Sequence, residues 1–261
     1  MPPPRHALLR EMLSTAGRDA AAAWSPSMWV DQKGDGTPVT RADVAADRTI
    51  RAFLAEHYPG EAIASEELGG QLGTGPTWLV DPIDGTSCFV EGLAHWGPTV
   101  ARVVPGREGW VVDCAGLYLP RVDEYYFFEA GTGWFGDEVL PQLSSRQAPR
   151  SLYLPSRFHA YAELQSRNKG RNVGGTAAHL ALVARGAAEA AIVAPGWHPW
   201  DTAAGLALID AVGGTAACLP GGAMPDIVGG AGEPFIAGTP AAVASLLAPG
   251  IIRPRRREDP R

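Results

Sequence analysis

The sequence predicts a mixed α/β chain that contains a substantial antiparallel sheet. Apolar residues recur at helical spacing in several segments, which alternate with short apolar runs that are typical of strands. Three such runs follow one another directly, at residues 99–104, 110–119 and 124–129, and the turns between them are rich in Gly, Pro and Arg. Consecutive runs joined in this way predict antiparallel neighbours. We therefore expect helices and strands to share one layered architecture.

The individual elements follow from periodicity and from turn residues. The segments expected to be helical are 5–24, 41–57, 157–168, 176–185, 201–212 and 240–247. Besides the three runs above, the segments expected to be strands are 62–64, 78–80, 152–154, 188–193 and 234–236. Gly131, Gly133 and Gly136 spell G-x-G-x-x-G. No helical pattern follows them, so a hairpin turn is favoured over a dinucleotide site.

A polar segment divides the chain into two halves. Residues 141–150 contain two prolines and few apolar side chains, which is typical of a boundary. We expect an N-terminal α+β half at 1–145 and a C-terminal α/β half at 146–252. The Arg-rich residues 253–261 predict a basic disordered tail.

Composition narrows the class of protein. The chain has 261 residues, of which 46% are hydrophobic, enough for a real core. Its net charge of −6 excludes a global basic surface, so nucleic acid is not an expected partner. The three cysteines are far apart and form no C-x-x-C pattern, which favours a reduced, cytoplasmic setting. We expect neither a signal sequence nor a membrane span, because no apolar stretch approaches roughly 20 residues.

The segment D-P-I-D-G-T carries the strongest chemical signal. An apolar run, Trp78 to Val80, ends in two carboxylates, Asp81 and Asp84, on either side of a Pro-Ile pair that restricts the backbone. Residues 85–87 then offer turn residues and a helix start, where backbone N–H groups can hold a phosphate. Carboxylates for a hard cation thus stand beside amides for an anion. A strand that ends in a tight Asp-Gly turn, without any site, explains this segment equally well.

Two further acidic clusters decide between these interpretations. Glu66-Glu67 lies upstream in I-A-S-E-E-L-G-G, and Asp201 lies downstream in H-P-W-D-T-A-A-G. Together with D-P-I-D-G-T they resemble the inositol monophosphatase superfamily of magnesium-dependent, lithium-sensitive phosphatases, in which E-E, D-P-I-D-G-T and W-D-x-A-A-G segments occur in this order. The resemblance spans about residues 37–214. It implies a layered α-β-α-β-α sandwich with the catalytic site between two sheet-bearing halves, the first of which carries the metal-binding motifs.

The resemblance also implies two or three Mg²⁺ ions, which suit an all-oxygen site because Mg²⁺ prefers octahedral oxygen coordination. Glu66, Asp81 and the carbonyl of Ile83 would hold one ion. Asp81, Asp84 and Asp201 would hold a second, and a loosely held third would involve Glu66 as well. Two ions roughly 4 Å apart can clamp the attacking and leaving oxygens of a displacement.

The catalytic residues implied by the resemblance are Glu66, Asp81 and Thr86. Thr86 and Glu66 would orient and deprotonate a metal-activated water, while the N–H groups of Gly85 and Thr86 would receive phosphate oxygens. No residue resembles a phosphoenzyme nucleophile in context, so we expect direct attack by water. The residues expected to contact the phosphate or the rest of the substrate are Gly85, Thr86, Ser87, Gly175, Thr176, Ala177 and Asp201.

Several of these residues have plainer interpretations. Taken alone, Glu66 and Glu67 are typical of a solvated loop, and Asp201 is typical of a helix N-cap, a role that is compatible with binding a metal. Asp43 matches an acidic position of the family. It could support the site, or it could simply lie on the surface of a helix, and the sequence favours neither role. The residues expected to pack rather than to catalyse are His198, Trp200 and Cys88.

Two departures from the inositol-specific pattern bear on the substrate. Thr37 stands where inositol monophosphatases usually have an Asp. The segment G-T-P-V-T-R-A-D is more similar to the histidinol-phosphate and phosphoadenosine phosphatase branches of the family. Ala194 replaces a Glu that holds substrate hydroxyls, which favours catalysis over inositol specificity. We therefore expect a Mg²⁺-dependent phosphomonoesterase for a small polyol, sugar or amino-alcohol phosphate such as histidinol phosphate. A 3'-phosphoadenosine 5'-phosphate phosphatase, a non-catalytic RNA or transcription-complex binding protein, and a homodimer stay open.

Overall fold

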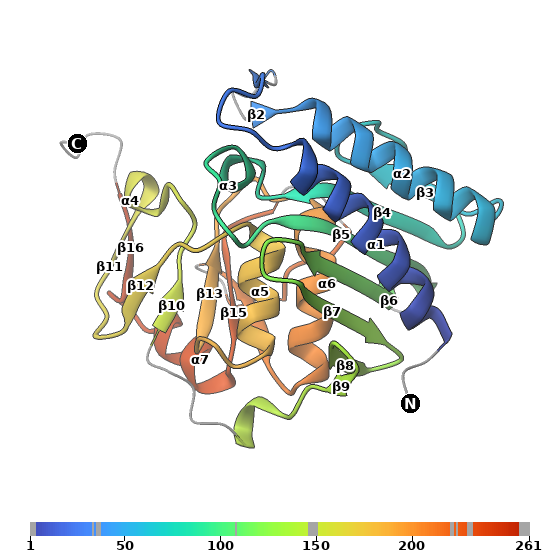
Figure 1. Cartoon of the computed structure of the whole chain (residues 1–261). Helices are drawn as coiled ribbons and strands as arrows, with labels where there is room; N and C mark the ends of the chain where they lie inside the picture. Colours follow the sequence, from blue (N-terminus) through green and yellow to red (C-terminus); the bar gives the residue numbers. More distant parts are fainter. Residues whose placement is uncertain are drawn as a thin grey trace.

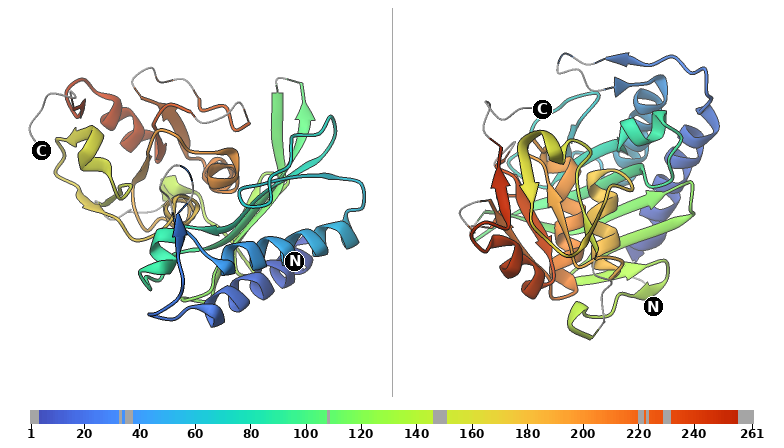
Figure 2. Two further views of the ribbon diagram at one scale, coloured as in Figure 1. Left: turned by 90° about the horizontal axis from the view of Figure 1, so that it is seen from above. Right: turned by 90° about the vertical axis from the view of Figure 1, so that its left-hand side faces the viewer.

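The computed structural model describes residues 4–32, 34, 38–107, 109–145, 151–219, 222, 224–228 and 232–255 (Figure 1). Its elements stack in five layers, which the view from above separates well (Figure 2). Two helices, a seven-stranded sheet, two further helices, a five-stranded sheet and a last helix follow one another. The predicted α-β-α-β-α sandwich is thereby confirmed.

The first sheet is built from consecutive strands in the order β3-β4-β5-β6-β7-β8-β9. Its strands are β3 (Ala62–Ser65), β4 (Thr77–Asp84), β5 (Gly97–Gly106), β6 (Gly109–Leu119), β7 (Glu124–Glu129), β8 (Thr132–Phe135) and β9 (Glu138–Val139). Strands β3 and β4 are parallel, and all later neighbours are antiparallel, as the short turns predicted. The G-x-G-x-x-G glycines lie in the β7–β8–β9 hairpins, which confirms the turn interpretation.

Helices α1 (Pro4–Ala23) and α2 (Arg41–His57) cover one face of this sheet. Their apolar stripes bury Leu9, Leu13, Ile50 and Leu54 against Trp78 and other side chains of the strands. Each such aliphatic side chain contributes about 1.5–3 kcal/mol when it leaves water. The short strands β1 (Asp31–Gln32) and β2 (Pro38–Val39) pair with each other between the two helices.

The second sheet has the order β12-β10-β13-β15-β14, in which neighbours are not consecutive in the chain. Its strands are β10 (Ser151–Tyr153), β12 (Lys169–Arg171), β13 (Ala190–Val193), β14 (Thr215–Cys218) and β15 (Phe235–Gly238). Helices α5 (Thr176–Ala184) and α6 (Pro199–Ala211) are almost wholly buried between the two sheets. Helix α7 (Pro240–Leu247) covers the outer face.

The structure corrects two predicted elements. The helix expected at 157–168 is only α4 (Phe158–Tyr161), and the chain then forms β11 (Ala162–Leu164). The first residues of the predicted disordered tail belong to β16 (Ile252–Pro254), because β16 pairs with β11, a partner that local sequence cannot show. Residues 256–261 lie outside the described part. Residues 146–150, where we placed the boundary between the halves, also lie outside it, beyond η1 (Leu143–Ser145).

Candidate metal and phosphate site

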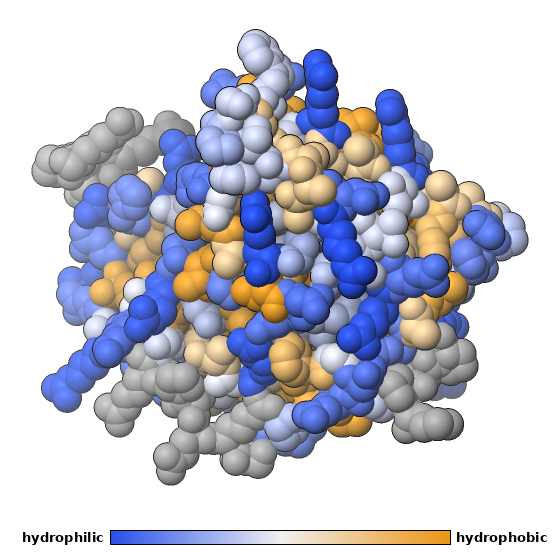
Figure 3. Space-filling model, in the orientation of Figure 1, coloured by the Kyte–Doolittle hydropathy of each residue, from blue (hydrophilic) through white to orange (hydrophobic). Residues whose placement is uncertain are grey.

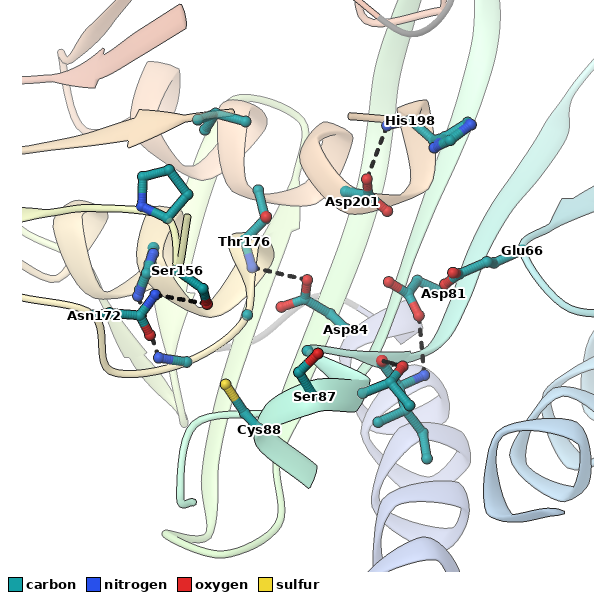
Figure 4. A pocket seen from close by; sticks show the side chains of 18 of the residues that line it. Glu66, Asp81, Asp84, Ser87, Cys88, Ser156, Asn172, Thr176, His198 and Asp201 are labelled. Carbon is teal, nitrogen blue, oxygen red and sulfur yellow. Dashed lines mark hydrogen bonds between the residues drawn. The ribbon is translucent and has the colours of Figure 1, made fainter. Parts of the chain in front are cut away.

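A pocket of about 310 Å³ lies where the two sheets meet. It is lined from the first half by the end of β4, by α3 (Thr86–Val90) and by the loop after β3. The second half contributes the start of α5, the end of β13 and the start of α6. Figure 4 shows these elements converging, with their polar side chains turned inward.

Strand β4 delivers both of its carboxylates to this pocket through a bulge. Asp81 pairs with Thr99 and Asp84 with Gly97, so β4 carries one extra residue between the two pairs. Side chains three positions apart on a regular strand point to opposite faces, and a bulge resets this alternation. Asp81 and Asp84 are each only 3% exposed and both line the pocket. The Pro-Ile pair in the motif is therefore the structural device that aligns the two acids.

Three carboxylates from distant parts of the chain form a compact cluster. One oxygen each of Glu66, Asp81 and Asp201 lie within 4.8 Å of one another (Figure 4). Glu66 is placed by the pairing of β3 with β4, since its N–H donates to the carbonyl of Val80 at 3.1 Å. The structure thus brings together three of the acids that the resemblance implied as metal ligands.

Asp201 sits one turn deeper in its helix than the sequence predicted. Helix α6 begins at Pro199, so the N-cap is His198 and Asp201 is the third helical residue. A carboxylate oxygen of Asp201 accepts the His198 N–H at 2.8 Å. The carboxylate therefore satisfies a free amide at the helix start and still belongs to the acidic cluster.

The cluster is electrostatically suited to a divalent cation. Burial raises the pKa of Asp81 well above its ordinary value, and the neighbouring charges of Glu66, Asp84 and Asp201 raise it further. Like charges at this distance resist simultaneous ionisation unless a cation joins them. The donors are oxygens only, and the carbonyl oxygen of Ile83, which also lines the pocket, lies 3.2 Å from the hydroxyl oxygen of Thr86. Such a donor set fits Mg²⁺.

Asp84 has a different environment from the other three acids. Its carboxylate accepts the backbone N–H groups of Thr176 at 2.9 Å and Ala178 at 3.2 Å, in the first turn of α5. Burial raises its pKa to about 7, although these N–H groups oppose the rise. Gly85, with φ of 83°, lets the backbones touch here, since a Cβ on it would lie 2.9 Å from Gly175. Asp84 therefore joins the two halves of the pocket.

Thr86 is held by a buried carboxylate that the sequence left undecided. The Thr86 hydroxyl lies 3.1 Å from Oδ1 of Asp43, which is 1% exposed. The other oxygen of Asp43 accepts the N–H of Thr40 at 2.8 Å and its hydroxyl at 2.6 Å. Burial raises the pKa of Asp43, and the hydrogen bonds from Thr40 and Thr86 oppose the rise. The T-x-x-D spacing of a capping box was the available signal.

The wall opposite the acids was missed by sequence reasoning. The side-chain amide of Asn172 donates to the carbonyl of Leu154 and to the hydroxyl of Ser156, both at 3.0 Å. Nε2 of His179 accepts the N–H groups of Val173 and Gly174, both at 3.2 Å. Burial lowers the pKa of His179 to about 4, so the ring is a neutral acceptor. Nothing in the spacing of these residues indicated that they shape a pocket.

The remaining predicted residues fall into two groups. Those that line the pocket are Gly85, Ser87, Cys88, Gly175, Thr176 and His198. The ring of His198 also stacks on Trp200, with centroids 4.9 Å apart. Ala177 is buried and Ala194 half-buried, and neither lines the pocket, whereas Val193 and Gly196 do. Thr37 lies outside the described residues.

A five-layered sandwich with a carboxylate pocket between its sheets defines the class of inositol monophosphatase-fold proteins. The chain belongs to the inositol monophosphatase family, whose model matches residues 6–258. Solved structures agree in fold. An extragenic suppressor protein suhB from Bartonella henselae superposes with a TM-score of 0.79 and 24% identity, covering 94% of this chain and 98% of that one. An IMPase from Thermotoga maritima gives 0.78 and 23%, covering 93% and 95%.

Relatives at higher identity carry several names. A histidinol-phosphatase from Chlorobaculum parvum is 32% identical over 200 residues, which cover 72% of this chain and 75% of the relative. An inositol-1-monophosphatase from Rhizobium meliloti is 31% identical over 243 residues, covering 85% and 89%. A Nus factor SuhB from Salmonella typhimurium is 29% identical over 232 residues, covering 83% and 84%.

Proposed function

We propose that this chain is a Mg²⁺-dependent phosphomonoesterase that hydrolyses a small phosphorylated metabolite by direct attack of water. The observation that carries the proposal is the cluster of Glu66, Asp81 and Asp201 beside the Thr86–Asp43 pair. This pocket combines oxygen ligands for a hard cation with a hydroxyl group that is oriented to bind a water molecule. Among the described residues, no helix is long and apolar enough to cross a membrane.

Each residue of the site has a role that its contacts support. Glu66, Asp81, Asp201 and the Ile83 carbonyl would hold the ions, and bound Mg²⁺ would acidify the attacking water and neutralise phosphoryl charge. The Thr86 hydroxyl gives its hydrogen to Asp43, which leaves its oxygen lone pairs free to accept a hydrogen from a water. Gly85 and Thr86 line the pocket at the start of α3, and their backbone N–H groups would receive phosphate oxygens.

The pocket supports a small substrate without specifying inositol. Its volume of about 310 Å³ suits a monophosphate of a polyol, sugar or amino alcohol. Ala194 follows Val193, which lines the pocket, and its methyl group offers no partner for ring hydroxyls; a site without a polar partner discriminates little for a hydroxyl. Histidinol phosphate is a candidate, since a relative at 32% identity is named a histidinol-phosphatase.

The experiment is a phosphate-release screen with matched metal conditions. Inositol 1-phosphate, histidinol phosphate, sugar phosphates and adenosine bisphosphates would each be tested with Mg²⁺, with EDTA, and with added Li⁺ or Ca²⁺. We expect turnover with Mg²⁺ alone and inhibition by the other two ions, because Ca²⁺ occupies such a site without aligning the reactants. Full activity after EDTA dialysis without added metal would refute the proposal.

A second candidate function is binding to RNA or to a transcription complex without catalysis. It is favoured by the relative named Nus factor SuhB. The intact acidic cluster favours catalysis instead, because a binding role does not require it. Retention of RNA on filters at physiological salt, with no phosphate release from any substrate, would favour this second function.

A further inference from the structure

A separate pocket lies at the amino ends of the parallel strands of the second sheet. It measures about 330 Å³ and is formed by residues 165–168 between β11 and β12, by Glu189 before β13, by one face of α7 and by Ile251. We call it the α7 pocket. The carboxyl end of β13 leads to the catalytic pocket, which Val193 lines. The four residues of β13 therefore separate the two pockets by ~13 Å, at about 3.3 Å per residue.

The α7 pocket presents a cation and a carboxylate that do not contact each other. Its charged lining residues are Arg167 and Glu189. Within the part of the chain that the structure describes, no ion pair includes either of them. A simple anion would be repelled by the carboxylate and a simple cation by the guanidinium, whereas a molecule with both charges complements both groups. The charges of the pocket thus favour a zwitterion.

Hydrogen bonds hold the carboxylate and the loop beside it in place. The side-chain amide of Asn168 donates to Oε2 of Glu189 at 2.6 Å, and no other described residue donates to this carboxylate. The Ser166 hydroxyl accepts the N–H of Asn168 at 3.1 Å. The Gln165 N–H donates to the carbonyl of Ile251 at 2.8 Å. Oε1 of Glu189 is therefore available to an ammonium group in a site that is already formed.

The floor of the α7 pocket is apolar. Ala242 and Leu246, on the buried face of α7, belong with Ile251 to one apolar cluster. An aliphatic, aromatic or thioether side chain would be stabilised on this floor, because it would leave water. The volume of about 330 Å³ falls within the range of ~300–1,000 Å³ that is typical of small-molecule sites.

The surface near the α7 pocket favours a small ligand over a protein partner. On the left of Figure 3, hydrophilic side chains lie over β11 and β12 and interrupt the hydrophobic areas between them. The centre of a protein–protein interface is usually apolar and depleted of charged residues. A charged pocket with an apolar floor, set in such a surface, is suited instead to a compact molecule that enters it.

We propose that the α7 pocket binds a free α-amino acid with an apolar side chain. The Arg167 guanidinium binds both oxygens of the α-carboxylate, a geometry that a planar fork of donors matches. Oε1 of Glu189 accepts the α-ammonium group, and the side chain lies on Leu246 and Ile251. Among the described residues, the α7 pocket shares no lining residue with the catalytic pocket. The inference therefore goes beyond the proposed phosphatase function and does not depend on it.

The test is calorimetric titration of the whole chain, supported by ligand-observed NMR. L-leucine, L-valine, L-methionine and L-phenylalanine would be titrated first. The amino acid that binds most tightly would then be compared with its amide, which lacks the carboxylate, and with the corresponding acid without the amino group. We expect each analogue to bind at least ~tenfold more weakly, which is the size of one charge-assisted hydrogen bond.

The variants Arg167→Gln and Glu189→Gln should each weaken binding by at least ~tenfold. Arg167 is exposed and forms no hydrogen bond within the described ranges, so its variant should fold as the wild type does. The matched control is Arg157→Gln, since Arg157 is an exposed arginine of the same half that lines neither pocket, and its variant should bind like the wild type.

Three results would overturn the inference. They are no binding of any of the four amino acids at millimolar concentration, equal affinity for the amide or for the acid without the amino group, and unchanged affinity in both pocket variants. Phosphate release measured on the same preparations reports separately on the proposed function. Amino-acid binding without phosphate release would leave the inference standing and refute that function.

Discussion

Asp81→Asn tests the metal site most directly, because Asp81 stands in the centre of the acidic cluster. The exchange is nearly isosteric, and the amide oxygen can still accept the Ile83 N–H that Oδ1 accepts now at 3.0 Å. What it removes is one negative charge among Glu66, Asp84 and Asp201. Turnover should therefore fall by more than ~10³, or about 4 kcal/mol, the scale of losing a main electrostatic stabiliser.

The same variant should leave the metal-free protein at least as stable as the wild type. In this cluster the pKa of Asp84 rises from 3.8 to about 7, which corresponds to roughly 4 kcal/mol of destabilisation when that group is ionised. Asp81 carries a penalty of the same kind, because burial and the charges of Glu66, Asp84 and Asp201 raise its pKa, so removing its charge should recover about 1 kcal/mol, or ~2–4 °C in Tm for a chain of this size. Phosphate release and thermal unfolding in EDTA would measure these two effects, and a Mg²⁺ titration would show whether the variant binds the ions more weakly.

Two outcomes would refute this reasoning. If Asp81→Asn keeps near wild-type turnover at saturating Mg²⁺, the carboxylate cluster does not hold the catalytic ions. If the variant instead loses several degrees of Tm in EDTA together with its activity, Asp81 has a structural role. Asp210→Asn provides a matched control, since Asp210 is an exposed residue on the same helix as Asp201.

Three further predictions follow from the geometry. Thr86→Ala should lower kcat by roughly 10²-fold without changing the Mg²⁺ requirement, since only the hydroxyl that Asp43 orients is lost; an unchanged kcat would contradict this role. Ala194→Glu should raise the rate on inositol 1-phosphate relative to histidinol phosphate, and an unaltered ratio would show that this position does not face the substrate. Metal-free protein should lose stability as pH rises from about 4 to about 7, because the raised pKa of Asp84 makes the folded state hold a proton that the unfolded state has released. Thermal unfolding in EDTA across this range would show it, and Asp84→Asn should flatten the slope.

The motifs in the sequence indicated most of the residues that line the candidate site, but they did not indicate how those residues are held. The motif around Asp81 and Asp84 was readable because a buried strand, a proline and a turn follow one another within a few residues. Asp43 could not be assigned, since its role depends on Thr86, 43 residues away in the chain. Local patterns describe one element at a time, whereas this contact exists only after α2 packs beside β4.

The second half shows the same limit more sharply. The helix expected at 157–168 failed because the apolar spacing there is equally consistent with a strand, and β16 supplies the partner that decides. The hydrogen bonds from the first turn of α5 to Asp84 could not be predicted either, because they join residues 84 and 176 across two layers. Resemblance to a family supplied the layered arrangement that spacing alone does not contain.

The strand order of the second sheet has a consequence for how the protein is made. Strand β15, at Phe235–Gly238, inserts between β13 and β14, both of which leave the ribosome earlier. The edge of β13 that pairs with β15 must therefore stay unpaired in the nascent chain until residue 238 has been synthesised. Because β13 also forms one wall of the catalytic pocket, a working enzyme cannot assemble until this late insertion is complete. Premature termination before this point should yield a protein without activity rather than one with a fraction of it.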